Sequence, residues 1–175
     1  MRPIYYPSWV GLEERVAMLL TRKTDYALVA LAGLARHPAA YASARDLAGQ
    51  LQLPLPVLRN ILKQLAAAGL LASTRGPSGG YKLSRPQGDI SLADVVAAIE
   101  GPMQLAMCCP VHPGDEPRCR LEDSCHIKSR VRHVHEGLVQ YLHQITLADI
   151  ADDAGSVPAP IVHMTLTENA PLGVR

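Results

Sequence analysis

A run of short, patterned segments between residues 18 and 88 is the feature that most constrains how this chain folds. Apolar residues recur every three or four positions over residues 24–36 and 44–51 and again between Pro56 and Gly69, which is the period of amphipathic α-helices. Only a few residues separate the last two segments, and the final one carries basic side chains on its outer face. This arrangement is typical of a helix-turn-helix.

The sequence also marks where these helices begin and end. Thr24 and Ser43 are candidate N-caps of the first two helices, because their side chains can accept a hydrogen bond from a free backbone N–H. Pro56 suits the first turn of the third helix, where its missing N–H is not needed. Gly69 supplies a C-terminal stop.

Two strand-like runs, residues 70–75 and 81–83, follow and flank the glycine-rich turn 76–80. A hairpin in this place is a wing, and glycine in its tip permits close approach to another molecule. We therefore predict a mainly α fold with a small β-hairpin, in which a winged helix-turn-helix DNA-binding domain spans residues 18–88. A cysteine loop and a long dimerisation helix complete the predicted fold.

Charge is divided unevenly along the chain, although the formal net charge is only +1. Residues 18–88 carry nine Lys or Arg and two acids, a net charge of +7, whereas residues 89–175 carry six and twelve, a net charge of −6. A basic part joined to an acidic part is typical of a nucleic-acid-binding module with a regulatory region. An unevenly charged solvated surface is the simpler alternative.

The outer face of the third predicted helix presents candidate DNA-contacting residues. Arginine prefers guanine and asparagine prefers adenine in the major groove, so Arg59 and Asn60 are the candidates for reading bases. The basic residues around them are more typical of phosphate contacts, which position the protein without specifying sequence. The complete predicted set is Arg22, Lys23, Pro56, Arg59, Asn60, Lys63, Arg75, Gly79 and Lys82. For each of them a solvated surface role is the alternative.

Beyond the wing, residues 89–126 hold a predicted linking helix, 92–100, and a loop that contains all four cysteines. Residues 127–153 hold a long helix, with an apolar stripe from 127 to 145, and a short closing helix. The long helix has little local core to cover, so it is a candidate dimerisation helix. The alternative is that it packs on its own domain.

The two ends of the chain lack this patterning. Residues 1–17 are an N-terminal extension, and Met18 opens the patterned segment, so 1–17 are either a genuine arm or the product of a mis-assigned start. Residues 154–175 are punctuated by proline and glycine and are predicted to be a disordered tail.

Several classes of protein are excluded by what the sequence lacks. No segment holds the roughly 20 apolar residues that span a bilayer, and the first residues have no continuous apolar core of a signal peptide. We therefore predict a cytoplasmic protein without a membrane partner. No nucleophile elbow, phosphate loop or H-E-x-x-H motif is present, so we predict neither an enzyme nor a small-molecule substrate.

The cysteine loop points to metal or redox chemistry, because the cytoplasm keeps thiols reduced. Thiolates bind iron–sulfur clusters and zinc, and a bound metal centre can order a loop without a core of its own. Three interpretations stay open: an iron–sulfur cluster, a structural zinc, or a metal-free thiol switch. The residues concerned are Cys108, Cys109, Cys119 and Cys125, with His126 or His112 as further zinc ligands.

These motifs resemble those of the IscR/NsrR-type winged-helix regulators, the Rrf-two or BadM-like family, over about residues 18–150. The most specific match is Gly69-Leu70-Leu71 followed by Arg75-Gly76-Pro77-Ser78-Gly79-Gly80-Tyr81 in the wing. The segments 20–27, 55–65, 90–102 and 145–150 are similar to further family motifs.

The resemblance implies a homodimer that binds near-palindromic double-stranded operator DNA, usually as a repressor, and senses a 2Fe–2S or 4Fe–4S cluster. By position, the ligands would be Cys109, Cys119 and Cys125, with Asp25 of the partner subunit as the fourth. Cys108 and His126 are the alternative ligands. The alternative for Asp25 is an interaction with the dipole of its own helix.

Within the family, the motifs look most like those of regulators of the SUF cluster-assembly operon, and nitric-oxide-sensing repressors share the same Asp. The expected signal is therefore iron, redox or nitric oxide status. Arg59 stands where the housekeeping cluster-assembly regulator has an acidic residue, so the operator preference of that regulator is not carried over.

Overall fold

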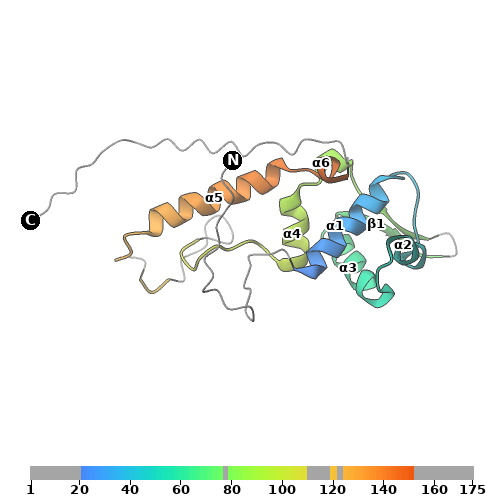
Figure 1. Cartoon of the computed structure of the whole chain (residues 1–175), viewed down its shortest axis with the longest axis horizontal. Helices are drawn as coiled ribbons and strands as arrows, with labels where there is room; N and C mark the ends of the chain where they lie inside the picture. The colour runs from blue at the N-terminus through green and yellow to red at the C-terminus, as the bar shows by residue number, and fades with distance from the viewer. Residues whose placement is uncertain (1–20, 77–78, 110–118, 122–123, 152–175) are drawn as a thin grey trace, which may run out of the picture.

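The computed structural model of this protein describes residues 21–76, 79–109, 119–121 and 124–151. The predicted N-terminal extension 1–17 and the predicted tail 154–175 lie outside the described residues, as do His112 and the hairpin positions 77–78. The described elements are α1 (Arg22–Ala35), α2 (Ala44–Leu51), α3 (Leu55–Ala67), β1 (Leu71–Thr74), β2 (Gly80–Leu83), the 3-10 helix η1 (Gln87–Asp89), α4 (Leu92–Glu100), α5 (Lys128–Gln144) and α6 (Leu147–Ala151). The mainly helical fold with a small hairpin is confirmed (Figure 1).

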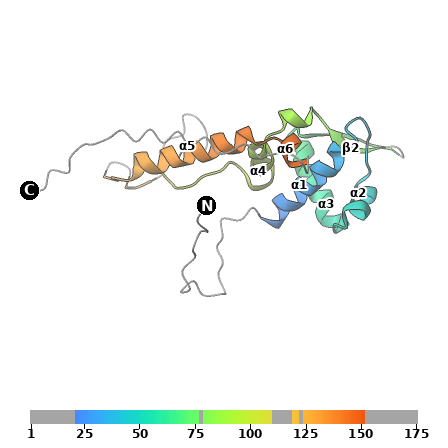
Figure 2. The same ribbon diagram turned by 45° about the horizontal axis from the view of Figure 1, so that its top comes forward.

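The core lies between α1, α2, α3, the hairpin, α4 and α6, which gather at one end of the molecule (Figure 2). The inner face of α3 buries Leu58, Ile61, Leu62 and Leu65 almost completely, at the helical spacing seen in the sequence. Burial of each such side chain contributes about 1.5–3 kcal/mol, so this face fixes α3 against α1.

The N-terminal end of α1 differs from the sequence prediction. Thr21, rather than Thr24, is the N-cap, and its side chain accepts a hydrogen bond from the N–H of Lys23 at 3.2 Å. Thr24 is fully buried and donates its hydroxyl to Glu100 at the end of α4. A helical pattern alone does not distinguish two threonines three residues apart. They differ in that Thr24 is buried, where the Glu100 carboxylate accepts its hydroxyl.

The predicted ends of α2 and α3 are confirmed. The Ser43 hydroxyl accepts the N–H of Asp46 at 3.1 Å, and Pro56 lies in the first turn of α3. After α3, Gly69 adopts a left-handed conformation with φ of 75°, which favours glycine. The N–H of Leu70 then donates to the carbonyl of Leu65 at 2.9 Å and closes the helix.

The wing is an antiparallel pair in which Leu71 lies opposite Leu83 and Thr74 lies opposite Gly80. A third segment joins its edge, because Ala42 exchanges two backbone hydrogen bonds of 3.0 and 2.9 Å with Tyr81. A side chain on Gly80 would come within 2.3 Å of the Ala42 carbonyl oxygen, so this close approach requires glycine.

Beyond the wing, α4 connects the winged domain to α5. Ser91 and Asp94 form a capping box at the start of α4, and Thr146 caps α6 through its hydrogen bonds with Asp149. The N–H of Leu92 donates to the carbonyl of Ile145 at 2.7 Å, which holds the C-terminal end of α5 beside α4.

The long helix α5 extends away from the winged domain in both views (Figures 1 and 2). It covers Lys128–Gln144, one residue less at each end than the predicted stripe. Its main contact is with α4. Ile127, which immediately precedes α5, is 62% exposed, and Val134 within α5 is 59% exposed. Within the described parts of the chain, no helix is long and apolar enough to cross a membrane.

Candidate DNA-binding face and cysteine loop

The outer face of α3 carries the predicted DNA-reading side chains. Pro56, Arg59, Asn60 and Lys63 are all exposed, and their spacing of three and four residues places them along one side of the helix. Among the described residues, neither the Arg59 nor the Asn60 side chain has an intramolecular hydrogen bond or ion pair. Their polar groups are therefore available to an outside partner, while the buried face of α3 holds the helix in place.

Further basic residues lie at the start of α1 and on the wing. Arg22 and Lys23 are exposed in the first turn of α1, and Arg75 is exposed after β1. Lys82 is half-buried, and its ammonium lies 4.8 Å from the centroid of the Tyr41 ring. This cation–π contact holds Lys82 in a defined place on the wing.

Gly79 has a structural explanation besides the predicted DNA contact. A side chain there would come within 2.3 Å of the Thr74 carbonyl oxygen, and the Gly79 N–H donates to Gly76 at 3.0 Å. Closure of the hairpin therefore requires glycine at this position. Contact of its backbone with DNA stays a prediction.

A carboxylate that sequence reasoning missed joins α1 to α4. Glu100 accepts hydrogen bonds from the hydroxyls of Thr21 and Thr24, the latter at 2.5 Å. These two hydrogen bonds, with a smaller contribution from the charge of Lys23, lower the pKa of Glu100 below its ordinary value of 4.5. The sequence held one signal, because an acid at a helix C-terminus opposes the helix dipole and so indicates a partner elsewhere.

The first two cysteines are buried in a turn that is tied to α5. Cys108 and Cys109 are 7% and 2% exposed, and the Cys109 N–H donates to Ala106 at 2.8 Å. The Cys108 carbonyl accepts from Arg132 Nε of α5 at 2.6 Å, and the Cys109 carbonyl accepts from Gln104 Nε2 at 2.8 Å. The backbone of this pair is therefore fixed directly against the long helix.

The thiols influence one another. Burial raises the pKa of the Cys108 thiol, and the charge and hydrogen bonding of Cys109 and the charge of Cys119 raise it further. Cys125 is half-buried just before α5, and all four cysteines are free thiols. Among the described residues, however, no three His, Cys, Asp or Glu side chains lie close enough together to hold a metal.

Two of the three candidate fourth ligands, Asp25 and His126, lie at the surface. Asp25 is exposed in the first turn of α1, next to the buried Thr24, and His126 is exposed just before α5. Neither is enclosed by its own chain, so each is accessible from outside.

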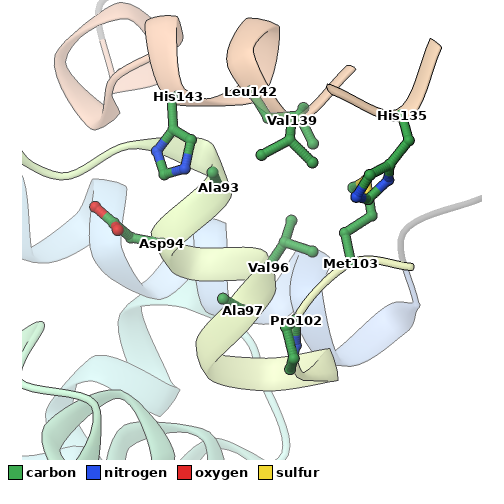
Figure 3. Close-up of a pocket in the computed structure, with 10 residues that line it drawn as sticks. All are labelled: Ala93, Asp94, Val96, Ala97, Pro102, Met103, His135, Val139, Leu142 and His143. Atoms are coloured by element: carbon green, nitrogen blue, oxygen red, sulfur yellow. The ribbon is translucent and has the colours of Figure 1, made fainter. Parts of the chain in front are cut away.

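A cavity of about 220 Å³ lies between α4 and α5 (Figure 3). His135 and Met103 lie together at one end of it, and His143 lies at the other. His135 is only 6% exposed, and its Nδ1 has no hydrogen-bond partner among the described residues. The packing between α4 and α5 is therefore looser than in the winged domain.

Comparison with known proteins identifies the family. A family model described as "Rrf2: Iron-dependent Transcriptional regulator" matches residues 20–153. The chain belongs to the Rrf2 family. It is a DNA-binding transcription regulator, and the role of this family is not enzymatic, as the motifs predict.

Individual Rrf2-family relatives agree. The HTH-type transcriptional regulator IscR of Vibrio vulnificus is 31% identical over 140 residues, which cover 78% of this chain and 79% of the relative. The structure of T. potens IscR matches with a TM-score of 0.58 and 27% identity over 82% of this chain and 95% of that one. The structure of CymR (YrzC), the global cysteine regulator of B. subtilis, matches with a TM-score of 0.52 and 27% identity over 77% and 97%.

Proposed function

We propose that this Rrf2-family regulator binds operator DNA as a homodimer and that an iron–sulfur cluster on the cysteine loop controls the binding. The observation that carries this proposal is the hydrogen bond from Arg132 of α5 to the Cys108 carbonyl. It connects the loop that would hold the cluster to the helix that would form the dimer interface.

Dimerisation is supported by the surface of α5. This helix has 17 residues and is therefore about 25 Å long, yet His135 is its single buried side chain among the described residues. Ile127 and Val134 expose apolar surface beside the half-buried Val131, Leu138 and Tyr141. An apolar stripe of this length on a soluble domain is typical of a protein interface, and a second α5 is the occupant we propose.

The DNA contacts follow from the dimer. Two copies of α3 would enter successive major grooves about 34 Å apart, which predicts an operator with two related half-sites. Arg59 and Asn60 would read bases, and Arg22, Lys23 and Lys63 would contact phosphates. We propose that binding represses the regulated genes.

The cysteine loop offers a donor set that suits iron and sulfide. Its four thiols form no disulfide, and a bound cation would offset the burial and the neighbouring thiols that raise the pKa of Cys108. We propose Cys109, Cys119 and Cys125 as ligands, with Asp25 of the partner subunit as the fourth ligand and Cys108 or His126 as its alternatives. When bound, the cluster supplies a redox-active centre that iron starvation, oxidation or nitric oxide can remove.

Release of the loop would then act through contacts within the chain. Arg132 and Gln104 hold the Cys108–Cys109 backbone, so a rearranged loop changes what α5 packs against. Because α5 joins the two subunits in this proposal, its shift changes the spacing of the two α3 helices. The regulated genes we propose are those for iron–sulfur cluster assembly, as in the SUF-type regulators that the motifs resemble, and nitric-oxide-responsive genes are the alternative.

A second candidate keeps DNA binding but replaces the cluster with a metal-free thiol switch or a structural zinc. The observation in its favour is the burial of the adjacent free thiols of Cys108 and Cys109 in one turn. Oxidation of such a pair by a peroxide would form a disulfide and release water.

Purification without oxygen separates these candidates. Brown protein with matched iron and acid-labile sulfide supports the cluster, stoichiometric zinc supports the structural metal, and colourless protein after reconstitution supports the thiol switch. Cys119→Ala is expected to lose the cluster and change operator affinity. Cys108→Ala keeps both if Asp25 of the partner subunit is the fourth ligand, and loses the cluster if Cys108 takes that place. Operator affinity that is the same with and without the cluster contradicts the sensing proposal.

A further inference from the structure

We propose that Glu100 is a positioning residue that couples the cysteine loop to the DNA-contacting first turn of α1. The inference rests on the proposed control of operator binding by this loop. It adds a specific joint, formed by Glu100, Thr21 and Thr24, between the sensing part and the reading part of one subunit.

The contacts of Glu100 are long-range in sequence and concentrated on one turn. Its Oε1 atom accepts the hydroxyls of Thr21 and Thr24, which lie 79 and 76 positions away. These two threonines flank Arg22 and Lys23, the exposed basic residues proposed to contact phosphates. Thr24 is fully buried, so the carboxylate holds a side chain that cannot turn to water instead.

Glu100 also stands where the cysteine loop begins. It is the last residue of α4, and Gly101 leaves the helix with φ of 89°, a conformation that favours glycine. Pro102 follows, and within a few residues the chain reaches the buried Cys108–Cys109 turn. The end of α4 and the start of α1 meet in both ribbon views (Figures 1 and 2), so a displacement of the loop pulls directly on this joint.

Because Glu100 is negatively charged, the direction in which its removal changes DNA affinity tests the proposal. A carboxylate at a helix C-terminus gains nothing from the helix dipole, and beside Arg22 and Lys23 it repels the DNA phosphates. If Glu100 were only a surface charge, removing it would tighten DNA binding. If it positions the first turn of α1, removing it weakens DNA binding.

The experiment compares Glu100→Ala, Glu100→Gln and wild-type full-length protein, with Asp89→Asn as the control that removes one exposed carboxylate from η1. Operator affinity is measured for cluster-loaded and cluster-free protein, together with the thermal midpoint. We expect Glu100→Ala to weaken operator binding by about tenfold, a typical coupling between sites, and to bring the loaded and cluster-free affinities together. Glu100→Gln is expected to recover much of both effects, because its amide oxygen still accepts the Thr24 hydroxyl.

If Glu100→Ala does not fold, Thr24→Val is used in its place. Valine has the shape of threonine, with a methyl group where threonine has the hydroxyl. Operator binding by Glu100→Ala that is as tight as wild type, or tighter as in Asp89→Asn, overturns the proposal. If Glu100→Ala keeps the same difference in operator affinity between cluster-loaded and cluster-free protein as the wild type, the coupling alone is overturned. Equal affinities for loaded and cluster-free wild-type protein overturn the coupling together with the sensing proposal.

Discussion

The winged domain and the α5–cysteine region of this Rrf2-family regulator differ in how they are stabilised. In the winged domain, α1, α3 and the hairpin bury a continuous set of aliphatic side chains. In α5 and the cysteine turn, the buried side chains among the described residues are those of Cys108, Cys109 and His135, all of which are chemically active. The winged domain therefore holds its shape with an aliphatic core that α4 and α6 help to close, whereas α5 and the cysteine turn leave surface and thiols for a partner.

The largest expected effect tests the aliphatic core. Leu62→Ala removes a fully buried side chain from α3, and comparable truncations cost about 2.7–5.0 kcal/mol of unfolding free energy. Urea unfolding measures this change. Val57→Ala on the same helix is the control, because Val57 is 40% exposed and its truncation is expected to cost less than about 0.5 kcal/mol. Equal losses in the two variants would contradict the assigned faces of α3.

The second test addresses the region that lacks a core. Val134→Glu places a charge on the exposed apolar face of α5, and a central interface residue of this kind is expected to cost about 2 kcal/mol or more of dimer affinity. Sedimentation should show monomers, while the unfolding of the winged domain remains close to wild type. Glu136→Gln, an exposed change on the same helix, should leave the dimer intact. A dimeric Val134→Glu protein would place the interface elsewhere.

The third test compares two kinds of DNA contact within the winged domain. Arg59→Ala is expected to cost about 1–3 kcal/mol on the cognate operator and to relax the preference for one base. Lys23→Ala should instead weaken binding to all sequences and lower the salt dependence by about one phosphate contact. Titrations against the operator and single-base variants at two salt concentrations separate these outcomes. Equal losses by Arg59→Ala on every sequence would make Arg59 a phosphate contact.

Sequence patterns predicted the winged domain well because its signals are local. Helix period, the Ser43 cap, the Gly69 stop and the glycine-rich hairpin depend on residues close in sequence, and each has the predicted place. The exposed face of α3 followed from the same period. These local signals were enough to assign the chain to the DNA-binding regulators, without knowledge of contacts between residues distant in sequence.

The errors and omissions arose where distant residues meet. Thr24 was predicted to cap α1, but its hydroxyl is taken by Glu100, and no local pattern reports a partner 76 positions away. The Arg132 contact with the Cys108 carbonyl was missed for the same reason. The arrangement of the metal donors stays a prediction, because much of the loop between Cys109 and Cys125 lies outside the described residues.

A smaller effect is expected from the loose packing beside α5. His135 buries an Nδ1 atom that has no partner among the described residues, and such a group costs about 1–3 kcal/mol. His135→Phe keeps an aromatic ring, removes the polar atoms and extends into the cavity between α4 and α5. We expect it to raise the unfolding free energy by about 1 kcal/mol, whereas His133→Phe at an exposed position should not. Destabilisation by His135→Phe would indicate that the imidazole has a partner in the assembled protein.

The smallest effect concerns pH and two carboxyls, that of Glu100, which joins α4 to α1, and that of Asp149, which caps α6. Hydrogen bonds from Thr21 and Thr24 lower the pKa of Glu100 from 4.5, and the side chain and N–H of Thr146 lower the pKa of Asp149 from 3.8. A carboxyl whose pKa is lower in the folded state favours folding above its unfolded pKa, and this contribution is lost as the pH falls through the folded pKa.

Stability should therefore be constant with respect to these two groups near neutral pH and decrease below about pH 4.5. Urea unfolding between pH 6 and pH 3 measures the decrease. Glu100→Gln and Asp149→Asn should each flatten the curve by a small amount, because both carboxyls are accessible to solvent, and Asp89→Asn should not. A curve that stays as steep in the double variant would assign the acid sensitivity to carboxyls other than Glu100 and Asp149.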